Sequence, residues 1–425
     1  MRLFFLIVLP FFFQTYGQIK SIKTISINSD MNIWSFAVLK NSQTNENYLV
    51  IYSLNDKPAK SKISVYNSKY QLVLEKEFTE ILPYFSSSSG SHSTVLGRKN
   101  FHFIGEKYVY ILDIDKLKIE SIKLSDNRYE NINQKRRVYY EQLNNQEILV
   151  FDCGKTIDIY ATNHFKLLYS FKKEYEERGS GTKPFIDQNN IIYLNKKNEL
   201  ICKEIKTDRI IWEYSTGTEG ISFLGITVGN APDYISEYIL VDEKPRSIFI
   251  NTSAGDLIKI NAENGKEIVK HDRFRNNKNL TKSYDGRLTF ISQADMNEDG
   301  IPDFPSVSTD KNIYCINGKD LSTMWYYSTS SKFEDLISLY DINSDSIPEI
   351  FAINIDQSIF IIDGKTGHAL VNEKLSTSGF GSRAVLCDYN SDGSLDLVCI
   401  LPTNQVSIYE LNDINVNKGL IVINK

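Results

Sequence analysis

Residues 383–411, "RAVLCDYNSDGSLDLVCILPTNQVSIYEL", decide the fold because they hold one cycle of a pattern that recurs along the chain. Two short apolar runs, "RAVLCD" and "LDLVCI", flank an acidic loop, and an alternating run, "QVSIYEL", follows a short turn. Short apolar or alternating runs bounded by Gly, Asn, Asp and Pro are typical of β-strands. With "GLIVINK" at 419–425 as a fourth run, this region predicts a sheet of four short strands.

The unit of strand, turn and strand occurs eight times. Successive units are 44 to 48 residues apart, except for two spacings of 56. The equivalent apolar residues are Ile63, Val109, Ile157, Ile201, Leu257, Ile313, Ile359 and Val406. A near-constant period and four strands per unit are typical of propeller blades. We therefore predict an all-β fold, a single eight-bladed β-propeller of four-stranded antiparallel blades, with seven blades as the alternative.

The blades are expected to run from "NIWSFAVL" at 32–39 to "GLIVINK" at 419–425. A solenoid of stacked strands is the competing fold, but it needs capping ends. Because full units stand at both ends of the repeat, we expect a closed ring. The two long spacings predict insertions around 231–246 and 273–283, both as surface loops.

The first 17 residues have the pattern of a secretory signal peptide. Arg2 gives a basic start, an apolar run follows at 3–13, and small residues precede an expected cut between Gly17 and Gln18. A membrane anchor is the alternative, but this apolar run is shorter than the stretch of about 20 apolar residues that a helix needs to span a bilayer. We therefore expect a propeller domain at 18–425 that is secreted, either extracellular or, in a Gram-negative bacterium, periplasmic.

Composition narrows the possible partners. The net charge of −5 is mild, so it indicates neither a nucleic-acid footprint nor a polybasic membrane patch.

An odd number of cysteines leaves at least one unpaired within the chain, and most lie in apolar strand-like runs. They are Cys153, Cys202, Cys315, Cys387 and Cys399. We expect small buried side chains rather than a disulfide framework, although one disulfide remains compatible with an oxidising compartment.

An acidic loop recurs in the last three units. It reads "DMNEDGIPD" at 295–303, "DINSDSIPE" at 341–349 and "DYNSDGSLD" at 388–396, with starts 46 and 47 residues apart. Each copy lies between the first and second predicted strands of its unit. A single copy is equally compatible with a solvated Asx-turn that holds no metal. Three copies in register with the blades favour a metal-binding loop.

The alternating oxygen-bearing side chains suit calcium, which takes about six to eight oxygen ligands at about 2.3–2.6 Å. Positions 1, 3 and 5 supply side chains, position 7 a main-chain carbonyl, and position 9 completes the shell. The predicted ligands are Asp295, Asn297, Asp299, Ile301 and Asp303; Asp341, Asn343, Asp345, Ile347 and Glu349; and Asp388, Asn390, Asp392, Ser394 and Asp396. We therefore predict up to three structural Ca²⁺ ions. Magnesium is less suitable, because it keeps waters and seldom uses an all-protein cage.

Position 6 needs a tight turn, which Gly300 and Gly393 supply with least strain. Ser346 departs from this pattern and costs about 1–2 kcal/mol if its backbone is left-handed. The middle loop is therefore expected to be the weakest, with the longer Glu349 as a compensating ligand. An EF-hand is the rival motif, but it needs flanking helices and Glu at position 12. The residues at that position are Ser306, Ala352 and Cys399.

The pattern Asp-x-Asn-x-Asp-Gly-x-x-Asp between blade strands resembles the FG-GAP (VCBS) repeats of integrin α-chain propellers and many secreted proteins. The fullest match is "FGSRAVLCDYNSDGSLDLVC" at 380–399, where Phe380 and Gly381 precede the loop. This resemblance implies FG-GAP-like calcium blades over 284–425. It also implies that calcium holds each loop in shape and performs no chemistry.

A second resemblance is to the quinoprotein-alcohol-dehydrogenase-like (PQQ-like) propeller repeats, with a strand, a Thr-Gly-Lys turn and a Trp. The matching segments are "KTDRIIWEYSTG" at 206–217 and "NAENGKEI" at 261–268. Trp212 and Trp325 stand at the Trp position, two units apart. Together the two resemblances cover about residues 199–411, and the first four blades match in strand rhythm alone.

The sequence shows no local signature of catalysis: no Gly-rich phosphate loop, no Gly-x-Ser-x-Gly elbow and no HExxH. The histidines are scattered without ligand spacing at His92, His102, His164, His271 and His368. A PQQ-dependent dehydrogenase-like enzyme and a polysaccharide-lyase-like enzyme remain the alternatives. Against the dehydrogenase, the chain has no adjacent cysteine pair, and it is short for either class.

We therefore expect a binding or adhesion module that recognises a protein or glycan partner through its loops. The candidate recognition loops are the predicted insertion at 231–246 and the Ser-rich run "SSSSGSHS" at 86–93. Two sequons, at Asn251 and Asn279, would carry glycans only in a eukaryotic source.

Overall fold

The computed structural model describes residues 21–410, apart from 27–30, 57–58, 81, 83–99, 106, 124–136, 153–155, 163–164, 173–182, 196, 224–225, 242, 254, 273–287, 334–337, 357, 375–383, 394 and 402–403. The expected signal peptide and the Ser-rich run therefore lie outside the described residues. Within that described part the regular structure is all strand, and no helix is long and apolar enough to cross a membrane.

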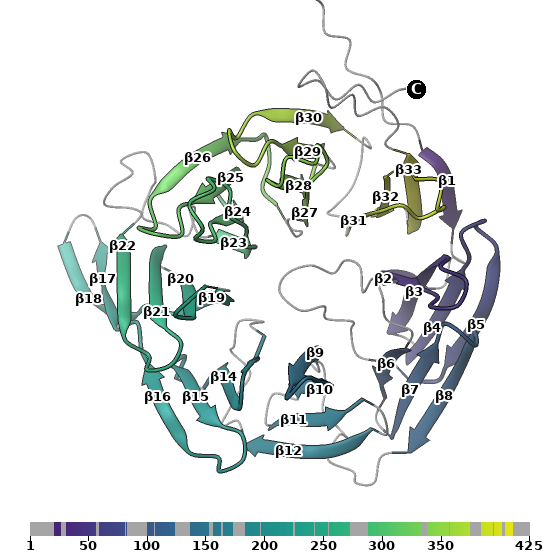
Figure 1. Ribbon diagram of the computed structural model, residues 1–425, viewed down its shortest axis with the longest axis horizontal. Coiled ribbons are helices and arrows are strands. Elements are labelled where there is room, and N and C mark those ends of the chain that lie inside the picture. Colours follow the sequence, from purple (N-terminus) through teal and green to yellow (C-terminus); the bar gives the residue numbers. More distant parts are fainter. Residues whose placement is uncertain are drawn as a thin grey trace, which may run out of the picture.

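Eight antiparallel sheets stand around a central axis as the blades of a propeller (Figure 1). Each blade is a meander in which the first strand lies nearest the centre and the last strand forms the rim. This arrangement confirms the predicted all-β, eight-bladed architecture. The eight equivalent residues identified in the sequence all lie in the strand next to the rim strand, and all are buried.

The first four blades contain β2 Asn32–Lys40, β3 Asn47–Asp56, β4 Ala59–Tyr66 and β5 Leu72–Phe78; β6 Asn100–Ile104, β7 Tyr108–Asp113 and β8 Lys118–Lys123; β9 Arg137–Leu143, β10 Gln146–Asp152, β11 Thr156–Ala161 and β12 Lys166–Lys172; and β13 Phe185–Asp187, β14 Asn190–Leu194, β15 Leu200–Glu204 and β16 Ile210–Tyr214. Blade 2 has three strands among the described residues, and the stretch before β6, 83–99, lies outside them.

The last four blades contain β19 Ile235–Val241, β20 Ser247–Thr252, β21 Asp256–Asn261 and β22 Glu267–Asp272; β23 Leu288–Ile291, β24 Phe304–Ser308, β25 Asn312–Ile316 and β26 Thr323–Ser328; β27 Ser338–Tyr340, β28 Glu349–Ile353, β29 Ser358–Ile362 and β30 Ala369–Lys374; and β31 Ala384–Cys387, β32 Asp396–Leu401, β33 Gln405–Glu410 and β1 Ser21–Ser26.

The ring is closed by strand β1, and here the sequence prediction is wrong. β1 pairs antiparallel with β33, from Ser21 opposite Tyr409 to Ser26 opposite Gln405, and so forms the rim strand of blade 8. The predicted rim strand, 419–425, lies outside the described residues. Sharing one blade between the two ends closes the ring with a hydrogen-bonded ladder, whereas two complete terminal blades would meet through side-chain packing alone.

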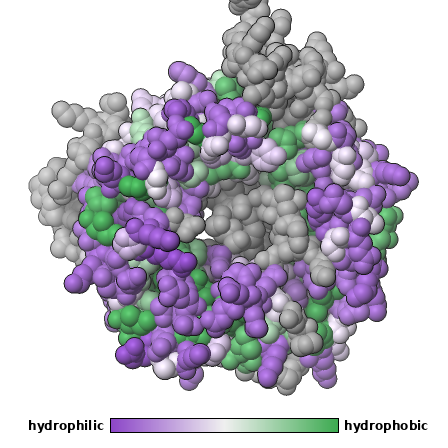
Figure 2. All heavy atoms as spheres, in the orientation of Figure 1, coloured by the Kyte–Doolittle hydropathy of each residue, from purple (hydrophilic) through white to green (hydrophobic). Residues whose placement is uncertain are grey.

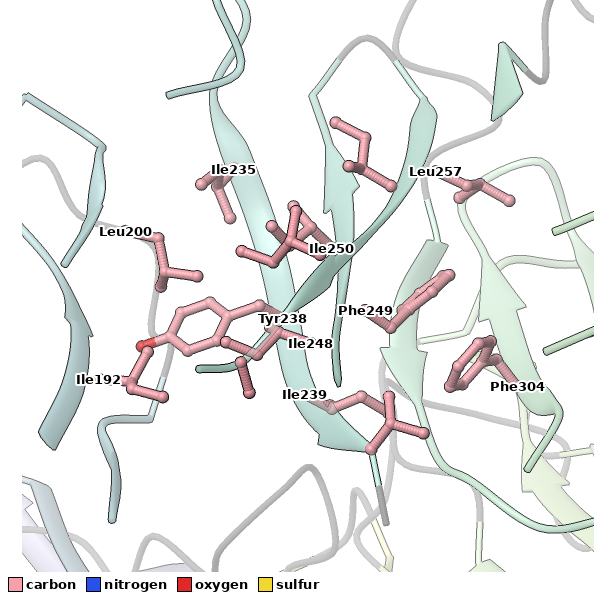
Figure 3. Packing of buried hydrophobic residues seen from close by; sticks show 14 of the residues in the cluster. Ile192, Leu200, Ile235, Tyr238, Ile239, Ile248, Phe249, Ile250, Leu257 and Phe304 are labelled. Carbon is pink, nitrogen blue, oxygen red and sulfur yellow. The ribbon is translucent and has the colours of Figure 1, made fainter. Parts of the chain in front are cut away.

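The hydrophobic core is a circle of clusters between neighbouring blades. Inner strands such as β20 and β24 are buried at every residue, because a blade covers each of their faces. Figure 3 shows this around blade 5, where Leu200 of blade 4 lies on one side and Phe304 of blade 6 on the other. The rings of Phe249 and Phe304 stack with their centres 4.0 Å apart. Blade packing therefore holds the ring together.

The inserted element between blades 4 and 5 differs from the prediction. It is a two-stranded hairpin, β17 Thr218–Phe223 and β18 Ile226–Pro232. The predicted insertion, 231–246, instead contains the first strand of blade 5, β19, in which Ile235 and Val241 are fully buried. The second predicted insertion, 273–283, lies outside the described residues.

Two further expectations concern buried side chains. Cys202, Cys315, Cys387 and Cys399 are buried and free, as expected for small core residues, while Cys153 lies outside the described residues. Asn251 is fully buried in β20, and its amide donates to the Leu288 carbonyl oxygen at 2.7 Å. The sequon at Asn251 is therefore inaccessible in the folded protein, and Asn279 is not among the described residues.

Candidate functional site

The three acidic loops join the first and second strands of blades 6, 7 and 8, as the sequence predicted. They also share one backbone shape, with positive φ at positions 4 and 6. These residues are Glu298 (61°) and Gly300 (83°), Ser344 (59°) and Ser346 (74°), and Ser391 (62°) and Gly393 (90°). Ser346 is therefore left-handed, which is the strained conformation that the sequence predicted for a non-glycine residue at this turn.

Oxygens at positions 1 and 3 converge inside each loop. In the first loop the amide of Asp299 donates to Asp295 Oδ1 at 3.1 Å and to Asn297 Oδ1 at 2.9 Å. The amide of Gly300 donates to Asp295 Oδ2 at 2.9 Å. The second and third loops repeat all three bonds from Asp345, Ser346, Asp392 and Gly393, at 2.9 to 3.1 Å. Because two oxygens meet at one nitrogen, they lie on the same side of the loop.

Position 9 is buried and fixes position 2. Asp303 accepts bonds from the amides of Met296 (3.0 Å) and Gly318 (2.8 Å). Glu349 and Asp396 hold the second residue of their own loops in the same way. These bonds are Ile342 N to Glu349 Oε2 at 2.7 Å and Tyr389 N to Asp396 Oδ2 at 3.0 Å. In each loop the ninth residue therefore ties the end of the acidic stretch to its beginning.

The carboxyl group at position 9 of each loop has a raised pKa, although the backbone amides that donate to it lower the pKa in part. Burial raises the pKa of Asp303, Glu349 and Asp396, and the carboxylates at positions 1 and 5 of the same loop raise it further. For Asp396 the pKa rises to about 6. Carboxylates that repel one another in a partly desolvated loop are stabilised in their charged form by a positive ion nearby.

The donor set fits a hard cation. Every predicted ligand is an oxygen, which suits calcium better than a thiolate- or imidazole-preferring metal. Within the described residues, no three His, Cys, Asp or Glu side chains form a metal site by themselves. A cation shell in these loops would have to include the amide oxygen at position 3 and the main-chain carbonyl at position 7. Ser394, which would supply that carbonyl in the third loop, lies outside the described residues.

The sequence prediction missed the second residue of each loop. Met296 and Tyr389 are fully buried, and Ile342 packs against the core between blades 7 and 8. A Cβ on Gly364 of blade 7 would lie 2.8 Å from the sulfur of Met296. Each loop therefore places its second side chain on the following blade. The only sign in the sequence is an apolar residue inside an acidic stretch.

Both tryptophans of the PQQ-like resemblance also link neighbouring blades. Trp212 Nε1 donates to the Ala262 carbonyl oxygen at 2.9 Å, and Trp325 Nε1 donates to that of Gly364 at 3.1 Å. A glycine with positive φ lies under each indole ring: Gly265 under Trp212 and Gly367 under Trp325. Equivalent tryptophans thus dock on equivalent turns, two blades apart.

The two ends of the strands give the ring two different faces. Because the strands of a blade are antiparallel, the loops between first and second strands leave from one face, and the connections between blades leave from the other. The acidic loops therefore share one face. Hairpin β17–β18 starts from the opposite face. Figure 2 shows one face of the ring, on which the coloured residues are mostly hydrophilic.

The hairpin is fixed at its root. The amide of Asp233 donates to the Gly217 carbonyl oxygen at 3.2 Å, so the two ends of the insertion are joined. Tyr234 exchanges two bonds with Ser253 of blade 5, at 2.7 and 3.0 Å. The strands β17 and β18 pair only with each other among the described residues. The insertion is thus an anchored projection from the ring.

The described histidines do not form a common site. His102 is buried beside Tyr140, whose hydroxyl lies 3.1 Å from its Nδ1. His271 lies in the rim strand of blade 5, and His368 is exposed in the turn before the rim strand of blade 7. His92 and His164 lie outside the described residues. These positions give no group of histidines that acts together.

No family model matches the chain, and no curated protein matches it in sequence. Solved structures do match its fold. BamB from Moraxella catarrhalis has 10% identity and a TM-score of 0.51, over 92% of this chain and 100% of that chain. The computationally designed Ika8 protein has 13% identity and a TM-score of 0.52, over 91% and 98%. Sqt1 from Saccharomyces cerevisiae has 10% identity and a TM-score of 0.58, over 92% and 98%. At such identities the likeness shows the fold alone.

Proposed function

We propose that this chain is a secreted, calcium-stabilised propeller that binds a macromolecular partner, a protein or a glycan, through the loops between its blades. The expected signal peptide supports export. The fold supports binding, because a rigid ring presents many loops in a fixed arrangement. In this proposal the acidic loops bind calcium and thereby stabilise blades 6 to 8.

The observation that carries this proposal is the separation of the two faces. The acidic loops are tied into the packing of neighbouring blades by buried side chains such as Met296 and Tyr389. The hairpin on the other face is fastened at its root, and among the described residues its two strands pair with each other alone. Isolated two-stranded hairpins are marginally stable in water, so a partner that covers this one would stabilise it. We assign a structural role to the face with the acidic loops and partner recognition to the face with the hairpin.

Calcium supplies positive charge and coordination to oxygen in this scheme. The side chains at positions 1, 3, 5 and 9 and the carbonyl at position 7 would hold it. Asp303, Glu349 and Asp396 also hold the loop closed through the amide at position 2. Their buried charge makes an occupied loop more favourable than an empty one.

Affinity capture from the extracellular or periplasmic material of the source tests the proposal. The bait is the full mature chain in calcium, and the comparison is a variant in which residues 218–232 are replaced by a short Gly-Ser linker. We expect the wild type to retain a specific protein that the variant loses, with similar melting temperatures for both. A matched control is Asp341→Asn, which alters the other face.

The outcomes separate the alternatives. Retention of the same partner by both baits would remove the hairpin from recognition. Binding to a glycan array without protein capture would identify a glycan partner. Turnover of a polysaccharide, or oxidation of an alcohol with added pyrroloquinoline quinone, would contradict the binding proposal in favour of a lyase-like or dehydrogenase-like enzyme.

A further inference from the structure

The ring closes at a seam where the C-terminal strands of blade 8, β31 to β33, meet the N-terminal segment that supplies β1 and then blade 1. Strand β1 pairs with β33 there, and β2 begins blade 1 beside it. Asn404, in the turn before β33, accepts a bond from the amide of Ile33 and donates to the Met31 carbonyl oxygen at 2.6 Å. Closure of the ring depends on the ladder between β1 and β33 and on contacts such as these, because β33 and β1 come from opposite ends of the chain.

The third acidic loop crosses this seam. Tyr389, its second residue, is fully buried in a cluster with Phe36 and Leu49 of blade 1. Its hydroxyl donates to the Asn67 carbonyl oxygen at 2.6 Å and contacts that of Tyr66 at 3.2 Å. The Asp388 carbonyl oxygen accepts a bond of 2.5 Å from Asn47 Nδ2. A loop of blade 8 is therefore fastened to blade 1 by both backbone and side chain.

Tyr389, whose side chain fastens the loop, stands between two of its predicted ligands. Asp388 and Asn390 flank Tyr389, and the carboxylate of Asp396 accepts bonds from the amides of Tyr389 (3.0 Å) and Asn390 (3.3 Å). An ion held by these ligands fixes the backbone on both sides of Tyr389. When the ion leaves, the loop backbone no longer holds Tyr389 firmly in its buried position against blade 1.

The other two loops do not share this role. Met296 and Ile342 contact the next blade through apolar packing. At these two boundaries the chain itself continues from one blade to the next, from β26 into blade 7 and from β30 into blade 8. Of the three second residues, Tyr389 alone carries a hydroxyl, and its loop is the one at the seam. The third loop thus differs from its two copies in what it connects.

We propose that calcium in the third loop latches the ring shut, with Tyr389 as the positioning residue that couples the ion to blade 1 and, through the buried cluster that also contains Ile25, to closure strand β1. This inference rests on the proposed calcium binding and adds a function to one of the three sites. An ion that binds the closed loop better than the open one shifts the ring toward its closed form.

Hydrogen exchange of the full mature chain, with calcium alone as the added ligand, tests the latch. We expect chelation to raise the exchange of β1 and β33 about tenfold or more relative to β20 of blade 5. Asp388→Asn is expected to give the same rise while calcium is present. Asp295→Asn makes the same chemical change in the first loop and is expected to leave β1 protected.

A milder variant, Tyr389→Phe, keeps the ring of the side chain and removes its two hydrogen-bonding contacts. We expect native mass spectrometry to show the wild-type number of calcium ions on this variant, with β1 less protected. Calcium bound in the third loop without any effect on β1 would overturn the latch and leave the proposed function intact. No bound calcium on the wild type would overturn both the latch and the calcium role.

Discussion

At the scale of single residues, position 6 decides how easily an acidic loop forms. Ser346 has φ of 74° and Gly393 has φ of 90°, yet only glycine adopts this region without strain. We expect Ser346→Gly to stabilise the protein by about 0.5–1 kcal/mol, the strain relieved less the extra freedom of the unfolded chain. The measurement is the midpoint of urea unfolding at constant calcium.

Gly393→Ser is the reciprocal change. A Cβ on Gly393 would meet nothing within 4 Å, so its cost is conformational and free of any clash. We expect a loss of about 1 kcal/mol. Equal midpoints for Gly393→Ser and the wild type would show that backbone strain at position 6 is unimportant.

The residues of the candidate site divide into those that sequence can reveal and those that it cannot. Asp295, Asn297 and Asp299 are recognisable as candidate ligands because each side chain carries an oxygen, and their alternating spacing is visible in the sequence. Tyr389 is not recognisable, because an apolar or aromatic residue has no local sign of which blade it will pack against. Its partners in blade 1 lie more than 300 residues away in the sequence.

At the scale of elements, the rim strands with tryptophan fasten neighbouring blades. Trp212 is buried and its Nε1 donates to Ala262, whereas Trp325 is only partly buried with its equivalent bond to Gly364. Trp212→Phe leaves a buried carbonyl without its donor, at a cost of about 1–3 kcal/mol.

Trp325→Phe is the matched control. Water can replace the lost donor at this more open position, so we expect a loss of about 0.5–1.5 kcal/mol. Urea unfolding of both variants checks the order. A larger loss at Trp325 than at Trp212 would contradict the assignment of the stronger dock to the buried residue.

The elements that sequence predicted correctly are those defined by local pattern. Alternation and continuous apolar runs identify third strands, which is why residues as distant as Ile63 and Val406 take equivalent places. The insertion was predicted at 231–246 and lies at 218–232, because a long spacing reveals that residues are added to a unit, and not which of its runs are the added ones. The true first strand of blade 5 starts at Ile235, inside the predicted insertion.

At the scale of the whole molecule, calcium is expected to raise the melting temperature. A ligand that binds only the folded state stabilises it by RT ln(1 + [L]/Kd), about 2.7 kcal/mol per site at a hundredfold excess over Kd. Differential scanning calorimetry with calcium and with chelator measures this effect. An unchanged melting temperature together with no calcium in the purified protein would exclude the metal role.

Single-site variants rank the loops within the ring. Asp388→Ala is expected to lower the melting temperature in calcium more than Asp341→Ala, because Ser346 already strains the middle loop. The third loop also joins blade 8 to blade 1 through Tyr389. A larger effect of Asp341→Ala would contradict both reasons at once.

Ring closure is the global feature that the sequence concealed, because two segments could fill the rim of blade 8. Local pattern favours 419–425, which follows β33 in the sequence, yet β1 occupies that edge of the sheet.

Removing residues 18–26 exposes the edge of β33 and the side of the sheet that Ile25 covers. We expect a loss of several kcal/mol, since burying one such side chain contributes about 1.5–3 kcal/mol and the ladder adds to it. Removing 419–425 is the matched truncation and is expected to leave the melting temperature unchanged. The opposite order in calorimetry would return the rim of blade 8 to the C-terminal segment.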